Sequence, residues 1–272
     1  MYILAIETTG PFGSVALVSE EENKCVVLGE MTSTDEMNHL KDLLPMVGRL
    51  LSAAGLAKSA LSHIAVSAGP GSFTGIRIGV STARALGQAL GIPCISVPTL
   101  DGFCRKENVC LGHEGAVTVG ILNARRGQVY GIVDGYLEGC PTMLTDVLEI
   151  VAGPVKADGR PVVFYGDGIN AYEPKILEIL GEAGMELGRD YFFAPVEVRY
   201  QNAAAVARLA YEKAVAGEVL HYNDLHPEYM RKAEAEEKLA AGQLPICQLP
   251  KQERLRSACC LLHLLQPVAG FG

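Results

Sequence analysis

The part of this sequence with the clearest capacity for chemistry is a glycine-rich stretch, SAGPGSFTGIRIGV, at residues 67–80. A glycine-rich turn that leads into a helix can present backbone N–H groups to a phosphate, and it can equally let two backbone segments pack closely. A Walker A loop ends in Gly-Lys-Ser/Thr, whereas here Gly75 is followed by Ile76 and Arg77. Because the lysine that reaches the phosphate is absent, the stretch is not a Walker A loop.

A dinucleotide-binding turn is also disfavoured. Its pattern is G-x-G-x-x-G, whereas Gly69, Gly71 and Gly75 follow the spacing G-x-G-x-x-x-G. A looser arrangement remains, in which amides from Ser72 to Gly75 lie at a helix N-terminus and accept an anion. The alternative is a tight strand-to-helix turn that binds nothing, and the residues alone leave both interpretations open.

The predicted helix after this loop carries small residues at intervals of four. Gly79, Ala83 and Gly87 form a smooth stripe, flanked by Val80 and other apolar residues, that a second helix can approach closely. We interpret the stripe as a contact with a helix of a partner. Packing of the stripe onto the chain's own sheet is the alternative.

Candidate metal ligands are few. The eight cysteines include no C-x-x-C pair, and most lie in apolar runs where a thiol behaves as a small hydrophobic group. Cys104, Cys110 and His113 are close in sequence, but their spacing matches no zinc pattern. We therefore expect reduced, structural cysteines and no metal site.

Charge and hydropathy restrict the class of protein. The formal net charge of −8 has the wrong sign for a chain that binds nucleic acid on its own, so any such role needs a basic partner. The first residues enter an apolar run without a basic leader, and no apolar stretch approaches the ~20 residues of a membrane span. These features predict a cytoplasmic protein that does not bind membranes.

The first hundred residues predict a mixed sheet with helices packed on it. Short apolar runs separated by turn residues indicate strands, and apolar residues at helical spacing indicate helices. The expected strands cover residues 2–7, 13–18, 24–31, 63–69 and 93–100. Helices are expected over residues 40–54 and 76–90, with Ser33 and Glu36 as a capping box and Pro45 at a start or kink of the first.

The second half has the same alternation with weaker signals. A hairpin is predicted over residues 116–137, with Asn123, Arg125, Arg126 and Gly127 at its tip. A short helix (147–153), a buried strand (161–168) and an alanine-rich helix (201–217) follow. We therefore expect two lobes, residues 1–104 and 105–232, with the helix at 201–217 packing back, and an unassigned C-terminal extension, residues 233–272.

The order of these motifs resembles the bacterial TsaB (YeaZ) family. The resemblance rests on ILAIETTGPFGSVAL, one histidine before a helix containing LLP, and SAGPGSFTGIRIGVSTARALGQALGIP, and it continues through NARRGQVYG, VVFYGDG and EYMRK. It covers roughly residues 1–232, and GPGSFTG followed by a basic residue and IG is its most specific element. The resemblance implies an α/β, two-lobed, actin-like ATPase (ribonuclease H-like) fold, with a mixed sheet and flanking helices in each lobe.

The resemblance also implies a role in tRNA modification. Family members work beside a catalytic paralogue, TsaD, and an ATPase, TsaE, to place threonylcarbamoyl on the adenosine next to the anticodon. The TsaB-type member is expected to support TsaD without being the catalyst, through a helical interface that resembles its own homodimer contact. Contact with tRNA is then expected only through the assembled complex.

Nucleotide use by the chain itself is disfavoured by departures from the motifs of the actin-like fold. Glu7 stands where kinases of this fold hold Mg²⁺ and where relatives usually carry aspartate; Asn123 and the Ser67-Ala68 pair are further departures. His39 is followed by Leu43, so the second metal-binding histidine of the catalytic paralogue is missing. We expect no catalytic residue and no cofactor in the chain alone, with ATP or ADP and Mg²⁺ only in the assembled complex. The nucleotide-loop candidates are Glu7, Thr8, Thr9, Gly69, Gly71, Ser72, Thr74 and Gly75.

The predicted partner and homodimer interface uses the two helices of the first lobe. Its candidate residues are Leu40, Leu43, Val47, Ile76, Gly79, Val80, Ala83 and Gly87. The alternative function is an autonomous enzyme of the same fold, either an ATP-dependent phosphotransferase that uses Glu7 and the GPGSFTG loop or a metallopeptidase-like protein.

Overall fold

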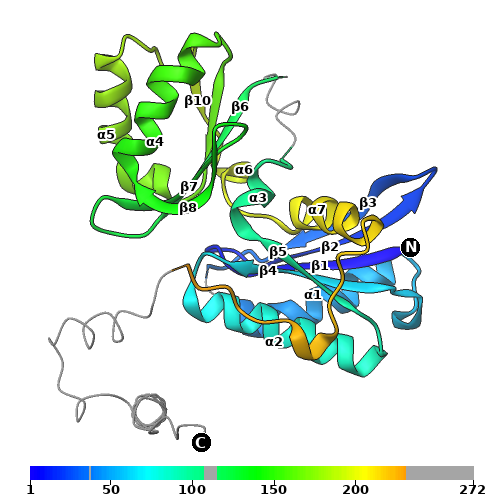
Figure 1. Cartoon of the computed structure of the whole chain (residues 1–272). Coiled ribbons are helices and arrows are strands. Elements are labelled where there is room, and N and C mark those ends of the chain that lie inside the picture. Colours follow the sequence, from blue (N-terminus) through cyan, green and yellow to red (C-terminus); the bar gives the residue numbers. More distant parts are fainter. Residues whose placement is uncertain (37, 107–114, 231–272) are drawn as a thin grey trace, which may run out of the picture. The chain divides into compact units, whose positions relative to one another are not determined.

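Two five-stranded mixed sheets form the framework of the protein (Figure 1). The structure is a computed structural model that describes residues 1–36, 38–106 and 115–230. Residues Met1–Met230 form one compact unit. Each sheet carries helices of its own, and both sheets are built mainly from short, buried apolar strands.

The first sheet has the strand order β3-β2-β1-β4-β5. Its strands are β1 (Tyr2–Glu7), β2 (Ser14–Glu21), β3 (Lys24–Thr32), β4 (His63–Gly69) and β5 (Cys94–Pro98). The central strand β1 pairs antiparallel with β2 and parallel with β4, and Glu7 lies opposite Ser14 at its carboxyl end. The carboxyl ends of β1 and β4 therefore meet at one edge of the sheet, where the glycine-rich loop begins.

Helices cover both faces of the first sheet (Figure 1). Helices α1 (His39–Ala53) and α2 (Phe73–Leu90) pack on one face, and α7 (Ala203–Val215) packs on the other. Side chains of β1 alternate between the two cores, with Leu4 and Ile6 on the α1 and α2 side and Ile3 and Ala5 against the alanines of α7. A strand buried on both faces explains why residues 2–7 read as a continuous apolar run.

The second sheet repeats the order and the strand directions of the first. Its order is β10-β9-β6-β7-β8, and its central strand β6 pairs antiparallel with β7 and parallel with β9. Its strands are β6 (Val117–Asn123), β7 (Gln128–Val133), β8 (Leu137–Met143), β9 (Val162–Tyr165) and β10 (Tyr191–Phe193). The fold is therefore duplicated, although the sequence shows no repeat.

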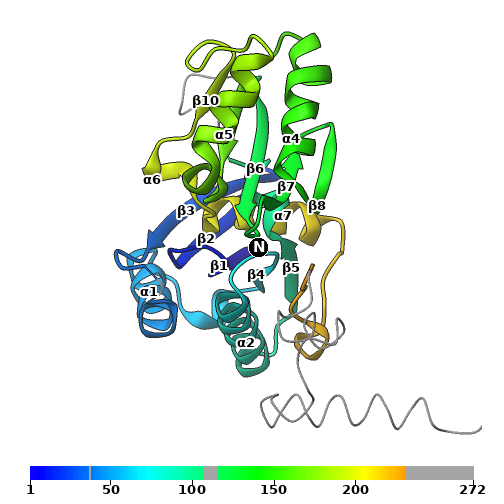
Figure 2. The same ribbon diagram turned by 90° about the vertical axis from the view of Figure 1, so that its left-hand side faces the viewer.

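Helices of the second lobe bury one face of its sheet, as Figure 2 shows. They are α4 (Leu144–Ile150), which continues as a π-helical turn (Val151–Val155), and α5 (Gly168–Glu182). The short helix α3 (Thr99–Phe103) lies on the opposite face, where Leu100 and Phe103 share a core with Val163 and Tyr165. The remaining short helices are Lys58–Ala60, α6 (Val196–Arg199) and Tyr222–Asp224.

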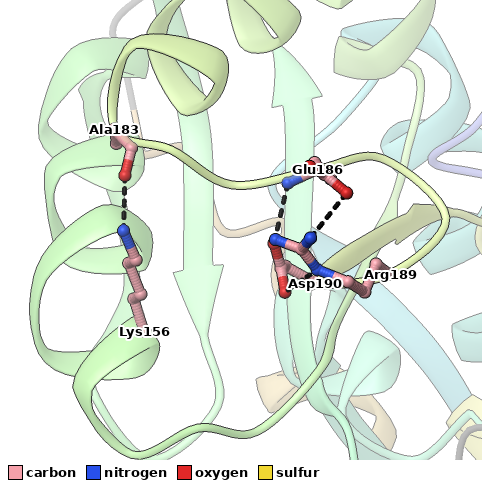
Figure 3. A network of polar contacts seen from close by, with 5 residues as sticks. All are labelled: Lys156, Ala183, Glu186, Arg189 and Asp190. Carbon is pink, nitrogen blue, oxygen red and sulfur yellow. Dashed lines mark hydrogen bonds and ion pairs between the residues drawn. The ribbon is translucent and has the colours of Figure 1, made fainter.

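A polar network holds the connection between α5 and β10 (Figure 3). Lys156 Nζ donates to the carbonyl oxygen of Ala183 at 2.5 Å, and Arg189 forms ion pairs with Glu186 at 2.6 Å and Asp190 at 2.7 Å. The Arg189 guanidinium holds the pKa of Asp190 below its usual value. Because these groups are exposed to solvent, their role is to fix the loop rather than to stabilise the lobe.

The predicted order of strands and helices in the first hundred residues is confirmed. The first hairpin, the third strand and the strand, helix and strand around the glycine loop all form, and α2 ends at Gly91 in the left-handed conformation. The hairpin tip and the alanine-rich helix of the second half form as well, and that helix packs on the first sheet. The boundaries proposed for the lobes stay predictions.

Other local predictions were wrong or incomplete. The capping box does not form: the N-cap of α1 is Asn38, and Ser33 Oγ donates to Asp42 at 2.5 Å instead. Pro45 lies inside α1, so it does not start that helix, and the kink stays a prediction. Helix α5, strand β8 and the short helix α3 were not predicted, because proline and glycine interrupt their patterns.

Some predictions fall outside the described residues. These are the extension at residues 233–272 and the candidate ligands Cys110 and His113. In the described ranges, no helix is long and apolar enough to cross a membrane.

Candidate functional site

Glu7 lies at the centre of a buried hydrogen-bond network at the end of β1. Its carboxylate accepts bonds from the Thr9 amide at 2.5 Å and the Thr9 hydroxyl at 2.6 Å, and its other oxygen accepts from the Ser67 hydroxyl. Thr9 belongs to the turn after β1, and Ser67 to the neighbouring parallel strand β4. The carboxylate therefore joins three pieces of backbone and is only 1% exposed.

This environment does not suit a metal ligand. Burial raises the pKa of Glu7, although the hydrogen bonds from Ser67 and Thr9 partly oppose that shift. Both carboxylate oxygens already accept bonds from hydroxyl or amide donors of the protein. A Mg²⁺ ion needs carboxylate oxygens that face a hydrated space, so Glu7 does not fit the role that kinases of this fold give the acidic residue.

The glycine loop packs directly on the turn that follows β1. A Cβ atom at Gly75 would lie 1.9 Å from the carbonyl oxygen of Thr8, and one at Gly71 would lie 2.6 Å from that of Thr9. Two hydrogen bonds close the contact: Ser72 N–H donates to Thr9 O at 2.8 Å, and Thr8 Oγ1 donates to Gly75 O at 2.8 Å. Only glycine allows the backbones to come this close.

Two amides of the proposed anion site already have protein partners. Ser72 is the N-cap of α2, and its side chain accepts from Gly75 N–H at 3.3 Å. The Ser72 amide is held by Thr9, as described above, whereas Thr74 is exposed. The structure thus brings most of the nucleotide-loop candidates together through contacts with one another, but not Gly69, where a Cβ would meet Glu228 O, or the exposed Thr74. This geometry favours the structural interpretation of the loop.

The predicted interface residues lie mostly inside the first lobe. Ala83 has no exposed surface, and a Cβ at Gly79 or Gly87 would meet Thr8 Oγ1 at 2.4 Å or Cys94 Sγ at 2.7 Å. The buried members of the set are Leu43, Val47, Ile76, Gly79, Val80, Ala83 and Gly87. The small stripe therefore packs on the chain's own sheet, which corrects our choice of residues for a partner contact. The contact itself stays a prediction.

Apolar side chains elsewhere on the same two helices are exposed. Leu40 and Leu44 on α1 are 80% and 58% exposed, and Phe73 on α2 is 42% exposed. The guanidinium of Arg77 lies 3.8 Å from the centre of the Phe73 ring, and its Nε donates to the Tyr229 hydroxyl at 2.9 Å. Of these residues only Leu40 was among the predicted interface residues. The helical spacing of Leu40 and Leu44, and of Phe73 and Arg77, was the available signal.

His39 is a buried structural residue rather than a surface histidine. Its Nε2 lies 3.1 Å from the carbonyl oxygen of Gly10, and a Cβ at Gly13 would lie 2.8 Å from its Nδ1. Burial lowers the pKa of His39, so the ring is neutral at pH 7 and Nε2–H donates to Gly10. Within the described part of the chain, no group of three or more His, Cys, Asp or Glu residues is placed to hold a metal ion.

Known proteins of one family match large parts of this chain. The family model described as TsaD, tRNA N6-adenosine threonylcarbamoyltransferase, matches residues 27–239. The tRNA threonylcarbamoyladenosine biosynthesis protein TsaB of Bacillus subtilis is 32% identical over 251 residues, which cover 89% of this chain and all of that protein. The Escherichia coli protein of the same name is 35% identical over 138 residues, 48% of this chain and 53% of that protein.

A solved structure agrees with these matches. YeaZ from Pseudomonas aeruginosa superposes with a TM-score of 0.63 at 27% identity and covers 84% of this chain and 99% of that one. Together with the two mixed sheets of the same strand order, this similarity establishes the actin-like fold. The predicted fold class is therefore confirmed.

Proposed function

Since the chain belongs to the TsaB (YeaZ) family of tRNA threonylcarbamoyladenosine biosynthesis proteins, we propose that it is a noncatalytic subunit of that machinery. In this role it binds and supports a TsaD-type paralogue, which transfers threonylcarbamoyl to the adenosine next to the anticodon. The wider role in threonylcarbamoyladenosine biosynthesis follows from the family. The noncatalytic status and the partner are the proposal.

The state of Glu7 is the observation that carries the noncatalytic assignment. The residue that should hold a metal is 1% exposed, and its carboxylate is committed to Thr9 and Ser67. The Thr8–Thr9 turn occupies the space beside the adjacent glycine loop. We infer that the chain alone requires no cofactor, and that ATP or ADP and Mg²⁺, where the reaction uses them, are held in the assembled complex.

The exposed face of α1 and α2 is the proposed contact with the TsaD-type protein and with a second copy of the chain. Leu40, Leu44 and Phe73 supply apolar area, and Arg77 stacked on Phe73 supplies the cation and aromatic ring typical of residues that dominate binding energy. We further propose that a TsaE-type ATPase joins this assembly, that tRNA is contacted only within it, and that the protein works in the cytoplasm.

Reconstitution of the modification tests the function. A mixture of tRNA, ATP, threonine, bicarbonate, the synthase that forms the intermediate, the TsaD-type protein and its ATPase is assayed with and without this chain. Product that requires the chain supports the proposal. Equal product in its absence, or tight Mg-ATP binding by the chain alone that a Glu7→Ala variant loses, favours the autonomous enzyme instead.

Paired variants test the interface. Leu44→Asp places a charge on the exposed face of α1, whereas Leu177→Asp makes the same change on α5 of the second lobe, where Leu177 is 37% exposed. We expect Leu44→Asp to weaken capture of the TsaD-type protein at least ~10-fold, because burying an unpaired carboxylate costs more than 1.4 kcal/mol. Equal capture by both variants excludes this face of α1.

A further inference from the structure

The turn between β6 and β7 holds two adjacent arginines in an unusual conformation. Arg125 and Arg126 have φ values of 67° and 55°, and Gly127 follows with 77°. The left-handed backbone conformation costs a residue other than glycine or asparagine roughly 1 kcal/mol or more. Two arginines therefore destabilise a hairpin tip relative to residues that favour this conformation. Asn-Gly or Gly-Gly would form such a turn at lower cost. The identity of the side chains therefore calls for an explanation beyond folding.

Hydrogen bonds with residues outside the turn hold it in place. Asn123 Oδ1 accepts from the Arg125 amide at 2.8 Å and from the Tyr172 hydroxyl at 3.0 Å, and that hydroxyl accepts from the Gly127 amide at 3.1 Å. Gly127 O also accepts from the Leu144 amide at 3.1 Å. Contacts from β6, α5 and α4 thus hold the turn in one geometry, and little conformational entropy is lost if a ligand binds there.

Both arginine side chains are exposed and lack an ion pair or hydrogen bond within the described ranges. Several other arginines of this acidic chain do have such partners; for example, Arg105 pairs with Glu212 at 2.8 Å and Arg189 with Asp190 at 2.7 Å. Nearby carboxylates are used elsewhere, since Asp167 accepts from the Asn123 amide at 3.0 Å. The two guanidinium groups are therefore available to bind an external anion.

We propose that Arg125 and Arg126 bind backbone phosphates of the tRNA substrate within the assembled complex. This inference rests on the proposed function. Guanidinium groups donate two parallel hydrogen bonds to phosphate oxygens, and this makes arginine the usual choice for nucleic-acid backbones. With a net charge of −8, the chain alone repels RNA, so this turn adds its contacts only after the partner proteins hold the tRNA.

The test measures tRNA affinity of the reconstituted complex as a function of salt. The probe is an unmodified tRNA transcript that the complex modifies, and the variant is R125Q/R126Q, which removes both charges and keeps a polar, unbranched side chain. A charge-matched control, K24Q/K58Q, alters two exposed lysines of the first lobe. A second variant, R125K/R126K, keeps the charge.

Loss of two phosphate contacts lowers the magnitude of the slope of log Kobs against log salt by about 1.4 to 1.8. At 0.1 M salt this corresponds to an affinity loss of roughly 25- to 60-fold. We expect this loss for R125Q/R126Q and a wild-type slope for R125K/R126K and the control. A loss above about threefold relative to the control, with a reduced slope, supports the proposal; a smaller loss overturns it.

Capture of the TsaD-type protein in the absence of RNA separates the other outcomes. If R125Q/R126Q loses this capture, the arginines contact an acidic protein surface, and the RNA assignment is wrong. If the wild-type chain is not captured and is not needed for product, the proposed function has failed. Normal capture and normal need for the chain, with unchanged tRNA affinity, overturn only the role of the arginines.

Discussion

Gly75 offers the sharpest test of whether the glycine loop is architecture. In Gly75→Ala, the new methyl group would lie 1.9 Å from Thr8 O and 3.1 Å from Thr8 C, so the loop and the turn must separate. Both clashing atoms are backbone and cannot rotate away. Separation also weakens the buried hydrogen bond from Thr8 Oγ1 to Gly75 O, which is 2.8 Å long.

Three contributions set the change in the free energy of unfolding, two of them destabilising and one stabilising. Overpacking costs about 1–3 kcal/mol, and loss of a buried hydrogen bond costs a further ~1–2 kcal/mol. The higher helix propensity of alanine offsets about 1 kcal/mol of this destabilisation, since Gly75 lies in the first turn of α2. We expect Gly75→Ala to lower the free energy of unfolding by about 1–4 kcal/mol.

Gly48 supplies the matched control. It lies inside α1 of the same lobe, and a Cβ there would meet no atom within 4 Å. Gly48→Ala should therefore stabilise the protein by about 0.5–1 kcal/mol, the opposite sign. Urea unfolding of both variants measures the difference. If Gly75→Ala is as stable as the wild type but binds Mg-ATP differently, the loop serves a ligand and our account of it is wrong.

Three further predictions follow. Burial raises the pKa of Glu7, so the folded state holds its proton more tightly and stability should fall as pH rises above about 4.5; Glu7→Gln should flatten this part of the stability curve, and an unchanged curve contradicts the assignment. Ala83→Arg should destabilise the lobe by more than ~4 kcal/mol in thermal unfolding, whereas Ser81→Arg on the exposed side of α2 should change stability by less than ~0.5 kcal/mol. Burial lowers the pKa of Lys106 to about 8, so wild-type stability should rise between about pH 8 and 10.5, and Lys106→Met should lack that rise.

The fold of the first lobe could be predicted because its signals are local. Alternating turns and apolar runs, and a glycine directly after the last apolar residue of α2, define elements without reference to the rest of the chain. The second lobe was harder to predict, because Pro174 lies inside α5 and Pro141 inside β8. Tertiary contacts there override residues that disfavour helix and strand.

That the small residues lie in a close contact was predictable, but the neighbour that they contact was not. Small residues at intervals of four identify a close contact, but they do not say whether a helix or a sheet is the neighbour. Gly79 faces Thr8 and Gly87 faces Cys94, both within the lobe, and only the folded structure reveals these neighbours. The same holds for Glu7, since its spacing from Thr9 is local whereas its bond from Ser67 depends on the pairing of β1 with β4.

The duplicated topology gives an independent reason to regard the glycine loop as architecture. In the second lobe the turn from β9 into α5 also carries glycines: a Cβ at Gly166 would lie 2.1 Å from Ile121 O, and one at Gly168 would lie 2.8 Å from the same atom. Ile121 belongs to β6, the central strand, just as Thr8 follows β1 in the first sheet. In both lobes, therefore, a glycine-containing turn packs directly against the backbone of the central strand or of the turn that follows that strand. Because the contact recurs at one topological position in two different sequences, the sheet order by itself explains the need for glycine at Gly75.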